Sequence, residues 1–380
     1  MSTPKILAVD VGYGNVKVFG TSCGDASNEQ GFHFPALAGR VVSSQQSAEY
    51  GAAVHVTRVR VGDDEYWVGK DTPEIVRRHT RSALESAYPM TPQYKALLLG
   101  ALHASGLSRI DVLALGLPAQ FIDNADMVQA MKDRYVGEHL CSDRRVYVDQ
   151  VRVYSQPVGG LASFAFEPAV MDIFKNNRCL VIDPGYNTVD WTVVASGKVL
   201  RSRNDSVKGG MAEYLRELEQ AVQQKYPEMQ FNTTYPLDAA VRGEKALSYN
   251  GAPVDISAEI ALAMPAWDNA IDVMVSATGS LKSYADVYVV GGAAPLMVAA
   301  LKKRYDGLNV KTSESLPILA NARGFFVMAR KAWNNAAMAG GNLPKAPPPD
   351  NRDGRDQRER GTAARASSGE RAAVKAAAHG

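Results

Sequence analysis

The chain has 380 residues, of which 46% are hydrophobic and 22% are charged, and its formal net charge is +2. Such a chain is long enough for two domains with substantial cores, and its charge argues against a protein that coats nucleic acid. The three cysteines show no CxxC spacing, which argues against disulfides and structural zinc. The N-terminal apolar run is only as long as a strand, and no 18 consecutive residues are apolar, so we expect neither a signal peptide nor a membrane span. These features favour a cytoplasmic protein.

The first predicted element is a β-hairpin near the N-terminus. An apolar run over residues 5–9 ends at Asp10, and a strand pattern resumes at Val16 after a turn that contains Gly12 and Gly14. A carboxylate at the end of a strand can hold a hydrated cation, and glycine lets the backbone approach a phosphate closely. Taken alone, this Asp-x-Gly pattern also fits an ordinary turn.

The middle of the first half predicts an inserted subdomain followed by α/β elements. Residues 21–105 contain a small, mostly β subdomain, because Gly, Ser and Asp interrupt short alternating pieces. The patterns at 110–117 and 146–154 predict strands, and 124–135 predicts a helix. Gln156 lies between the second of these strands and the next helix. Its amide could position an attacking water, although a polar helix cap is the simpler role.

A second hairpin, over residues 179–194, repeats the first. Residues 8–17 align without gaps on residues 181–190, and Asp, Gly, Tyr and Val match at four offsets. Two matching copies indicate two similar halves rather than two unrelated turns. We therefore interpret the hairpins as gripping one metal-bound polyphosphate between them.

Both hairpins supply candidate ligands. Asp10 and Asp183 are the predicted metal ligands and catalytic carboxylates, because Mg²⁺ takes one or two carboxylates and keeps several waters. Lys17 adds a positive charge for phosphate. The other loop residues that we expect at the nucleotide are Gly12, Tyr13, Gly14, Asn15, Gly185, Tyr186 and Asn187. Packing is the more ordinary role for the two tyrosines.

Two further segments are candidates for nucleotide contacts. Gly209 and Gly210 precede a helix predicted from about residue 212. Glu244 and Lys245 lie on a helix predicted over residues 237–247, where they could hydrogen-bond a ribose or flank a base. A solvated helix face is the alternative for this pair.

The C-terminal third ends in a segment of different composition. Gly291, Gly292 and Ala293 follow a buried strand, where an adenine could pack against bare backbone, although a close strand–helix turn would need the same glycines. A last helix is predicted over residues 321–337. Residues 341–380 are rich in Pro, Arg, Ala and Gly and predict a disordered tail, either solubilising or contacting a partner.

The order of these motifs resembles that of the actin-like ATPase superfamily, which includes actin, the seventy-kilodalton heat-shock chaperones and sugar kinases. The two phosphate loops look like residues 10–17 and 183–190, the connecting helices like 156–162 and 321–329, and the adenosine motif like 289–295. DVGYGNVK, GLP and IDPGYNTVDW are most similar to the ParM/StbA plasmid-segregation group, and QPVGGL resembles its PRTRC mobile-element branch.

The resemblance implies two ribonuclease H-like α/β domains with ATP and Mg²⁺ in the cleft between them. Asp10 and Asp183 would organise the metal, Lys17 would meet phosphate, and Gln156 would position the hydrolytic water. Pro184 departs from the family pattern and removes one N–H that could have met a phosphate. The expected boundaries are 1–157 for domain I, 158–320 for domain II, 321–340 for a helix returning to domain I, and 341–380 for the tail.

Three functions remain open at this stage. The first is an ATPase that forms nucleotide-dependent filaments and segregates a plasmid or mobile element through a DNA-binding adaptor, without reading DNA or binding a membrane itself. The second is a non-polymerising ATP-binding adaptor or scaffold. The third is a small-molecule kinase, for which we find no sugar-binding signature.

Overall fold

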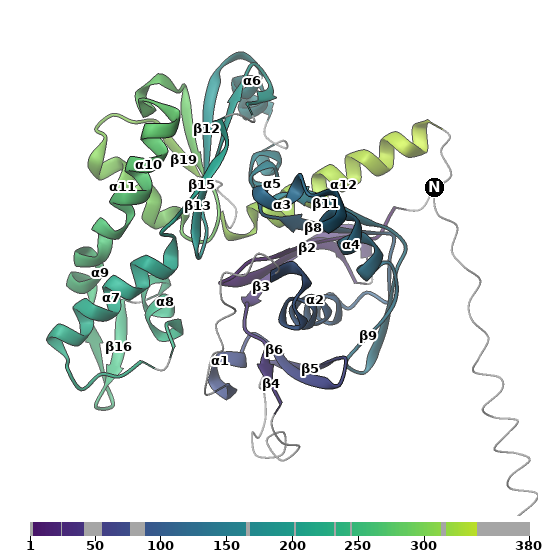
Figure 1. The fold of residues 1–380 in the computed structure, drawn as a ribbon, viewed down its shortest axis with the longest axis horizontal. Coiled ribbons are helices and arrows are strands. Elements are labelled where there is room, and N and C mark those ends of the chain that lie inside the picture. The colour runs from purple at the N-terminus through teal and green to yellow at the C-terminus, as the bar shows by residue number, and fades with distance from the viewer. Residues whose placement is uncertain are drawn as a thin grey trace, which may run out of the picture.

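Two α/β halves, each with its own central sheet, make up this computed structural model (Figure 1). The structure describes residues 3–23, 25–41, 55–76, 88–164, 168–200, 203–231, 233–243, 245–312 and 317–339. The predicted tail, 341–380, lies outside the described residues. No helix within the described ranges is long and apolar enough to cross a membrane.

The first half is organised around β1 (Ile6–Val11), the middle strand of a sheet in the order β11-β8-β1-β2-β3. All six β1 residues are buried because both faces of the strand are covered. Leu7 and Val9 belong to the core formed with α2, whereas Ile6 and Ala8 contact α12. The other bounds are β2 (Asn15–Ser22), β3 (Asp25–Pro35), β8 (Val112–Leu117), β11 (Val151–Ser155), α2 (Pro92–Ala104) and α12 (Ala320–Met338).

The second half repeats this arrangement around β12 (Arg178–Pro184), in the order β14-β13-β12-β18-β19, with β15 also pairing β13. Leu180 and Ile182 face a core shared with α7, α10 and α11, and Cys179 and Val181 face the opposite side. The other bounds are β13 (Thr188–Ala195), β14 (Lys198–Val199), β15 (Asp205–Lys208), β18 (Asp286–Val289), β19 (Val310–Thr312), α7 (Met211–Lys225), α10 (Asp268–Thr278) and α11 (Ala294–Arg304).

The two sheets share one connectivity, which confirms the predicted ribonuclease H-like halves. Strand β1 is antiparallel to β2 and parallel to β8, and β12 is likewise antiparallel to β13 and parallel to β18. The hairpin registers also agree: Asp10 is opposite Lys17 in the first half, and Asp183 is opposite Asp190 in the second. A one-residue shift in strand pairing would move every side chain to the other face of the sheet. Because the registers agree, matching residues of the two hairpins lie on the same face of their sheets.

Helices α5 (Gln156–Ser163) and α12 cross at the junction of the halves, and α12, yellow in Figure 1, continues along the first sheet. Their backbones come unusually close. A side-chain carbon at Gly324 would overlap the carbonyl oxygen of Gly159, and one at Gly159 would overlap the ring of Phe325. Glycine at both positions is therefore what allows this crossing.

Smaller elements surround the two sheets. Two three-stranded sheets flank the first half, and a two-stranded sheet lies in the second. Their strands are β4 (Gly39–Arg40), β5 (Val56–Val61), β6 (Asp64–Gly69), β7 (Arg109–Ile110), β9 (Gly137–Cys141), β10 (Arg144–Val148), β16 (Ala246–Tyr249) and β17 (Ala252–Asp255). The remaining α-helices are α1 (Thr72–Ile75), α3 (Ala119–Ile122), α4 (Ala125–Tyr135), α6 (Pro168–Asn176), α8 (Tyr235–Arg242) and α9 (Ser257–Ala263).

The structure differs from the sequence-based expectations in three places. Residues 25–35 extend the central sheet as β3 instead of starting the inserted subdomain, because they pair along β2. The strand expected over 146–154 is two strands, β10 and β11, in different sheets. The helix expected over 237–247 ends at Arg242, because Gly243 leaves the helical conformation.

Candidate functional site

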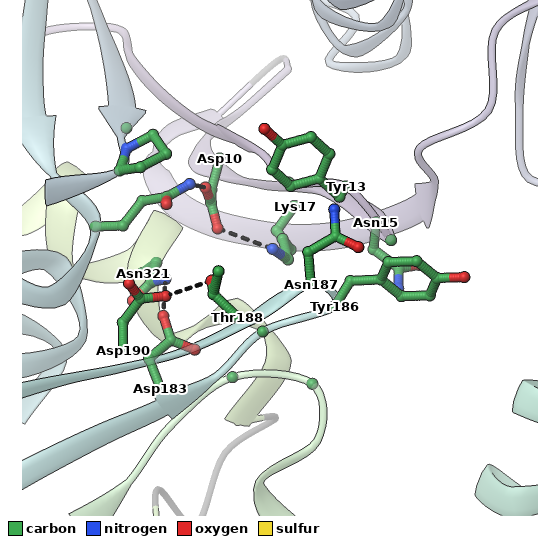
Figure 2. A pocket seen from close by; sticks show the side chains of 18 of the residues that line it. Asp10, Tyr13, Asn15, Lys17, Asp183, Tyr186, Asn187, Thr188, Asp190 and Asn321 are labelled. Atoms are coloured by element: carbon green, nitrogen blue, oxygen red, sulfur yellow. Dashed lines mark hydrogen bonds and ion pairs between the residues drawn. The ribbon is translucent and has the colours of Figure 1, made fainter. Parts of the chain in front are cut away.

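A pocket lies between the two halves, at the ends of their central strands and around both hairpin loops (Figure 2). Residues from both halves line it, although they are far apart in the sequence. The predicted site residues in its lining are Asp10, Gly12, Tyr13, Gly14, Asn15, Lys17, Gln156, Asp183, Gly185, Tyr186, Asn187, Gly291, Gly292 and Ala293. The fold therefore brings most of the predicted residues to one place.

The two hairpin loops are built in the same way. The Gly12 N–H donates to the Asn15 carbonyl oxygen at 3.1 Å, and the Gly185 N–H donates to that of Thr188 at 2.8 Å. Each bond closes a loop of two residues. The loops also meet across the pocket, where a side-chain carbon at Gly14 would lie 2.7 Å from the ring of Tyr186. A bare backbone at Gly14 is what permits this approach.

Asp10 is fully buried, and both of its carboxylate oxygens have partners. Lys17 Nζ lies 3.0 Å from Oδ2, and Gln156 Nε2 donates to Oδ1 at 2.7 Å. Room for the lysine comes from Gly12, where a side-chain carbon would lie 2.7 Å from Nζ. The first hairpin thus presents a buried ion pair, a pairing that offsets the cost of burying either charge.

Asp183 is surrounded differently. Its Oδ2 accepts a hydrogen bond from Asn321 Nδ2 at 2.7 Å, and the residue is 9% exposed. Burial raises the pKa of Asp183 to about 7, and the charge of Asp190 adds to this rise, whereas the bond from Asn321 opposes it. A cation in the pocket would favour the ionised carboxylate and reverse the effect of burial.

Asp190 places a second carboxylate beside Asp183. It takes the register position that Lys17 has in the first hairpin, so the two hairpins carry opposite charges there. Thr188 Oγ1 donates to Asp190 Oδ2 at 2.8 Å, and burial raises the pKa of Asp190. The second hairpin is therefore the more anionic of the two and the better place for a cation.

A cation also borders the pocket beside Gly292. Arg242 Nη1 donates to the Gly292 carbonyl oxygen at 2.7 Å, and Nε donates to Asp238 at 2.9 Å. Lys245, which we expected at the nucleotide, lies outside the lining among the described residues, because the helix ends before it and its φ is 58°. Glu244 lies outside the described residues.

Gly209 and Gly210 also lie outside the lining in the part of the chain that is described. They contact the second hairpin loop, where the Gly209 N–H donates to the Asn187 carbonyl oxygen at 3.2 Å. The Met211 N–H donates to that of Gly185 at 3.0 Å. The segment therefore supports the loop, and Met211 also lines the pocket.

The two loop tyrosines make packing contacts. The Tyr13 ring stacks on Tyr88, with centroids 4.4 Å apart, and Tyr88 itself hydrogen-bonds the Gly12 carbonyl oxygen. The Tyr186 hydroxyl lies 3.0 Å from Thr234 Oγ1. Both rings line the pocket while anchoring their loops to neighbouring elements.

The polar residues of this pocket that sequence reasoning missed include Thr188, Asp190, Arg242 and Asn321. Thr188 and Asp190 lie inside the repeated motif, and the alignment of Asp190 on Lys17 was a usable signal. Arg242 contacts Gly292 across 50 residues and Asn321 contacts Asp183 across 138, so the pattern of the repeated motif does not predict either contact.

The residues present suit a magnesium-bound nucleotide. No group of three or more His, Cys, Asp or Glu in the described ranges forms a metal cluster, and Mg²⁺ needs only one or two carboxylates with its waters retained. The buried Oδ1 of Asn321 has no partner among the described residues and could accept from such a water. The glycines let Lys17, Tyr186 and Asp183 lie close to the backbone around the pocket. Pro184 lacks the N–H that most residues would offer.

The repeated halves and the pocket between their hairpins define the actin-like class of protein. Residues 8–159 match the family model described as "Actin like proteins N terminal domain". The described residues have the actin-like, ParM-type fold. No curated protein sequence matches it.

Solved structures agree with this assignment over most of the chain. The archaeal actin homologue Ta0583 in complex with ADP has a TM-score of 0.66 at 15% identity, covering 86% of this chain and 99% of its own. The pSK41 ParM protein has a TM-score of 0.62 at 16% identity, covering 88% of this chain and 100% of its own. ParM from a 15-stranded filament of Clostridium botulinum has a TM-score of 0.67 at 16% identity, covering 87% of this chain and 100% of its own. At such identities the likeness establishes the fold.

Proposed function

We propose that the chain binds ATP with Mg²⁺ in this pocket, hydrolyses it, and uses the nucleotide state to control its assembly into filaments. The observation that supports this most is the pair of hairpins, equal in register and opposed across one pocket, with one carrying Asp10–Lys17 and the other Asp183–Asp190. A cation on one side and carboxylates on the other match the two charges of a metal-bound polyphosphate.

Each group of pocket residues has its own role in this proposal. Lys17 and the loop amides of both hairpins would bind phosphate oxygens, and Asp183 with Asp190 would hold the cation through its waters. Bound Mg²⁺ would supply neutralisation of phosphate charge. Gln156, held by its bond to Asp10, would orient the attacking water. Gly291, Gly292 and Ala293, beside Arg242, would receive the base.

The proposed assembly is a filament of copies of this chain that segregates a plasmid or mobile element. It is supported by the ParM filament among the similar structures and by the shared fold. We propose that a DNA-binding adaptor links the filament to its cargo, because a net charge of +2 offers little for direct DNA binding. The PRTRC branch remains a prediction.

Three measurements on the purified full chain test this proposal. Calorimetry with ADP and Mg²⁺ should show binding, phosphate release should show ATP turnover, and negative-stain microscopy should show filaments with ATP-Mg²⁺ and none without. Binding without turnover or filaments would favour the adaptor function instead. Phosphate transfer to an added small molecule would favour the kinase. Absence of nucleotide binding would overturn the proposal.

A further inference from the structure

Asn321 joins the pocket from the second residue of α12, which is 138 positions from the side chain it contacts. Its amide Nδ2 donates to Asp183 Oδ2 at 2.7 Å, and Figure 2 shows it beside Asp183 and Asp190. The residue is 6% exposed, so this is a buried interaction. The reversed amide orientation would place two acceptors against each other, so the hydrogen bond itself selects the one observed.

The space around this pair exists because glycines surround it. A side-chain carbon at Gly291 would overlap Oδ1 of Asp183, and one at Gly160 would lie 3.1 Å from Oδ1 of Asn321. The Gly291 N–H also donates to the Pro317 carbonyl oxygen at 2.9 Å, which ties this turn to the segment just before Asn321. The Asp183 carboxylate is thus held on several sides, with Asn321 as a fixed part of its surroundings.

The other end of the amide is the carbonyl oxygen Oδ1, which is available as a hydrogen-bond acceptor. Asn321 Oδ1 is buried and has no hydrogen-bond partner among the described residues. An unsatisfied buried acceptor costs about 1–3 kcal/mol, so a donor in the pocket would be bound favourably there. A water held by a cation is such a donor, and the neighbouring carboxylates are the groups suited to that cation.

The internal repeat gives Asn321 a counterpart. Helix α5 follows the fifth strand of the first sheet and begins with Gln156, whose amide donates to Asp10 at 2.7 Å. Helix α12 follows β19, the last strand of the second sheet, and its Asn321 amide donates to Asp183 at the same distance. Each hairpin carboxylate is therefore held by an amide from the first turn of the helix that follows its own sheet.

We infer that Asn321 is a positioning residue for the cation of the bound nucleotide: its amide N–H holds the Asp183 carboxylate in place, and its carbonyl oxygen accepts from a cation-bound water. This inference rests on the proposed nucleotide site. It also assigns the two halves different tasks. Both carboxylate oxygens of Asp10 have partners within the protein, whereas among the described residues a hydrogen bond is made only to Oδ2 of Asp183.

The test compares the affinity for ADP with and without Mg²⁺ in wild type, Asn321→Ala and Asn321→Leu, measured by calorimetry. Loss of a residue that orients a metal ligand typically weakens metal affinity about 10–100-fold. We therefore expect the gain in ADP affinity caused by Mg²⁺ to shrink about 10-fold or more in both variants, with metal-free ADP affinity kept within about threefold. ATP turnover should fall in parallel.

Asn309→Ala is the matched control, because Asn309 also donates its amide to a buried aspartate, Asp286, but outside the pocket. It should retain the wild-type effect of Mg²⁺. The inference is overturned if the Asn321 variants keep that effect, if Leu restores what Ala loses, or if Asn309→Ala loses it equally. Wild type that binds no ADP would overturn the proposed function itself, and the inference with it.

Discussion

At the scale of single residues, the site consists of two carboxylates with different partners. Asp10 is neutralised by Lys17 and bonded by Gln156, whereas Asp183 has an amide on one side and a second carboxylate, Asp190, nearby. Two similar groups thus receive different properties from their surroundings. In the function that we propose, this difference makes the first hairpin the phosphate-binding side of the pocket and the second hairpin the cation-binding side.

The first residue-scale prediction concerns turnover. Asp183→Ala should abolish ATP hydrolysis, because the pocket loses the carboxylate best placed for the cation. Gln156→Ala should slow hydrolysis about 100-fold while leaving nucleotide affinity largely unchanged, because its amide acts on the water and on Asp10. Phosphate release and calorimetry measure the two quantities. Undiminished turnover in both variants would refute these assignments.

The second residue-scale prediction concerns pH. Burial raises the pKa of Asp183 from 3.8 to about 7. Between these values the folded protein binds more protons than the unfolded chain, so this carboxyl lowers the free energy of unfolding as pH rises. Asp183→Asn removes the titration. Without nucleotide, the free energy of unfolding of the variant, relative to that of wild type, should rise by about 1 kcal/mol or more as the pH increases from about 5 to about 8.

Urea denaturation at several pH values provides that comparison, and the difference between the two proteins isolates Asp183 from other groups that titrate in both. A difference that stays constant with pH would show that Asp183 has an ordinary pKa in the folded protein.

At the scale of elements, the hairpins and the crossing helices determine where the pocket forms. Each hairpin ends at a two-residue loop, and α5 and α12 bring an amide to each carboxylate. The close approach of these helices depends on Gly159 and Gly324. Because α12 packs on the first sheet while Asn321 reaches Asp183, this one helix contacts both halves.

Gly324→Ala tests the crossing. Alanine favours a helix by about 1 kcal/mol over glycine, yet the added carbon would overlap the carbonyl oxygen of Gly159. We expect a net loss of about 1–3 kcal/mol in the free energy of unfolding by urea titration. Asn334→Ala, at an exposed position of the same helix, should change it by less than about 0.5 kcal/mol. A stabilised Gly324→Ala variant would contradict the crossing.

At the scale of the whole molecule, the pocket belongs to neither half alone. Its lining draws on β1, β2 and β8 of the first half, on β12 and β13 of the second, and on the segments that follow β8, β11 and β18. The large apolar cores are separate, one for each half. A ligand in the pocket would therefore connect two cores that otherwise meet through α5, α12 and the loops.

ADP with Mg²⁺ should accordingly stabilise the whole chain. At about 100 times the Kd, a ligand that binds only the folded state adds about 2.7 kcal/mol to the free energy of unfolding. We expect both halves to unfold at a higher temperature with ligand, observed by calorimetric melting. A shift confined to one of two separate transitions would show that the nucleotide contacts one half only.

The sequence by itself determined the parts whose cause is local. The apolar strand, the glycine turn and the carboxylate at the strand end lie within ten residues, so both hairpins, Lys17 and the position of Gln156 at a strand–helix junction were predictable. The repeat between the hairpins also predicted two similar halves, because equal local patterns form equal local structures.

The tertiary structure decided what depends on distant contacts. Asn321 reaches Asp183 across 138 residues, and Arg242 reaches Gly292 across 50. Lys245 turns out to lie away from the pocket because Gly243 ends its helix, and residues 25–35 join the central sheet because they pair with β2. Such pairings are selected by the packing of the whole chain, which residue spacing does not encode.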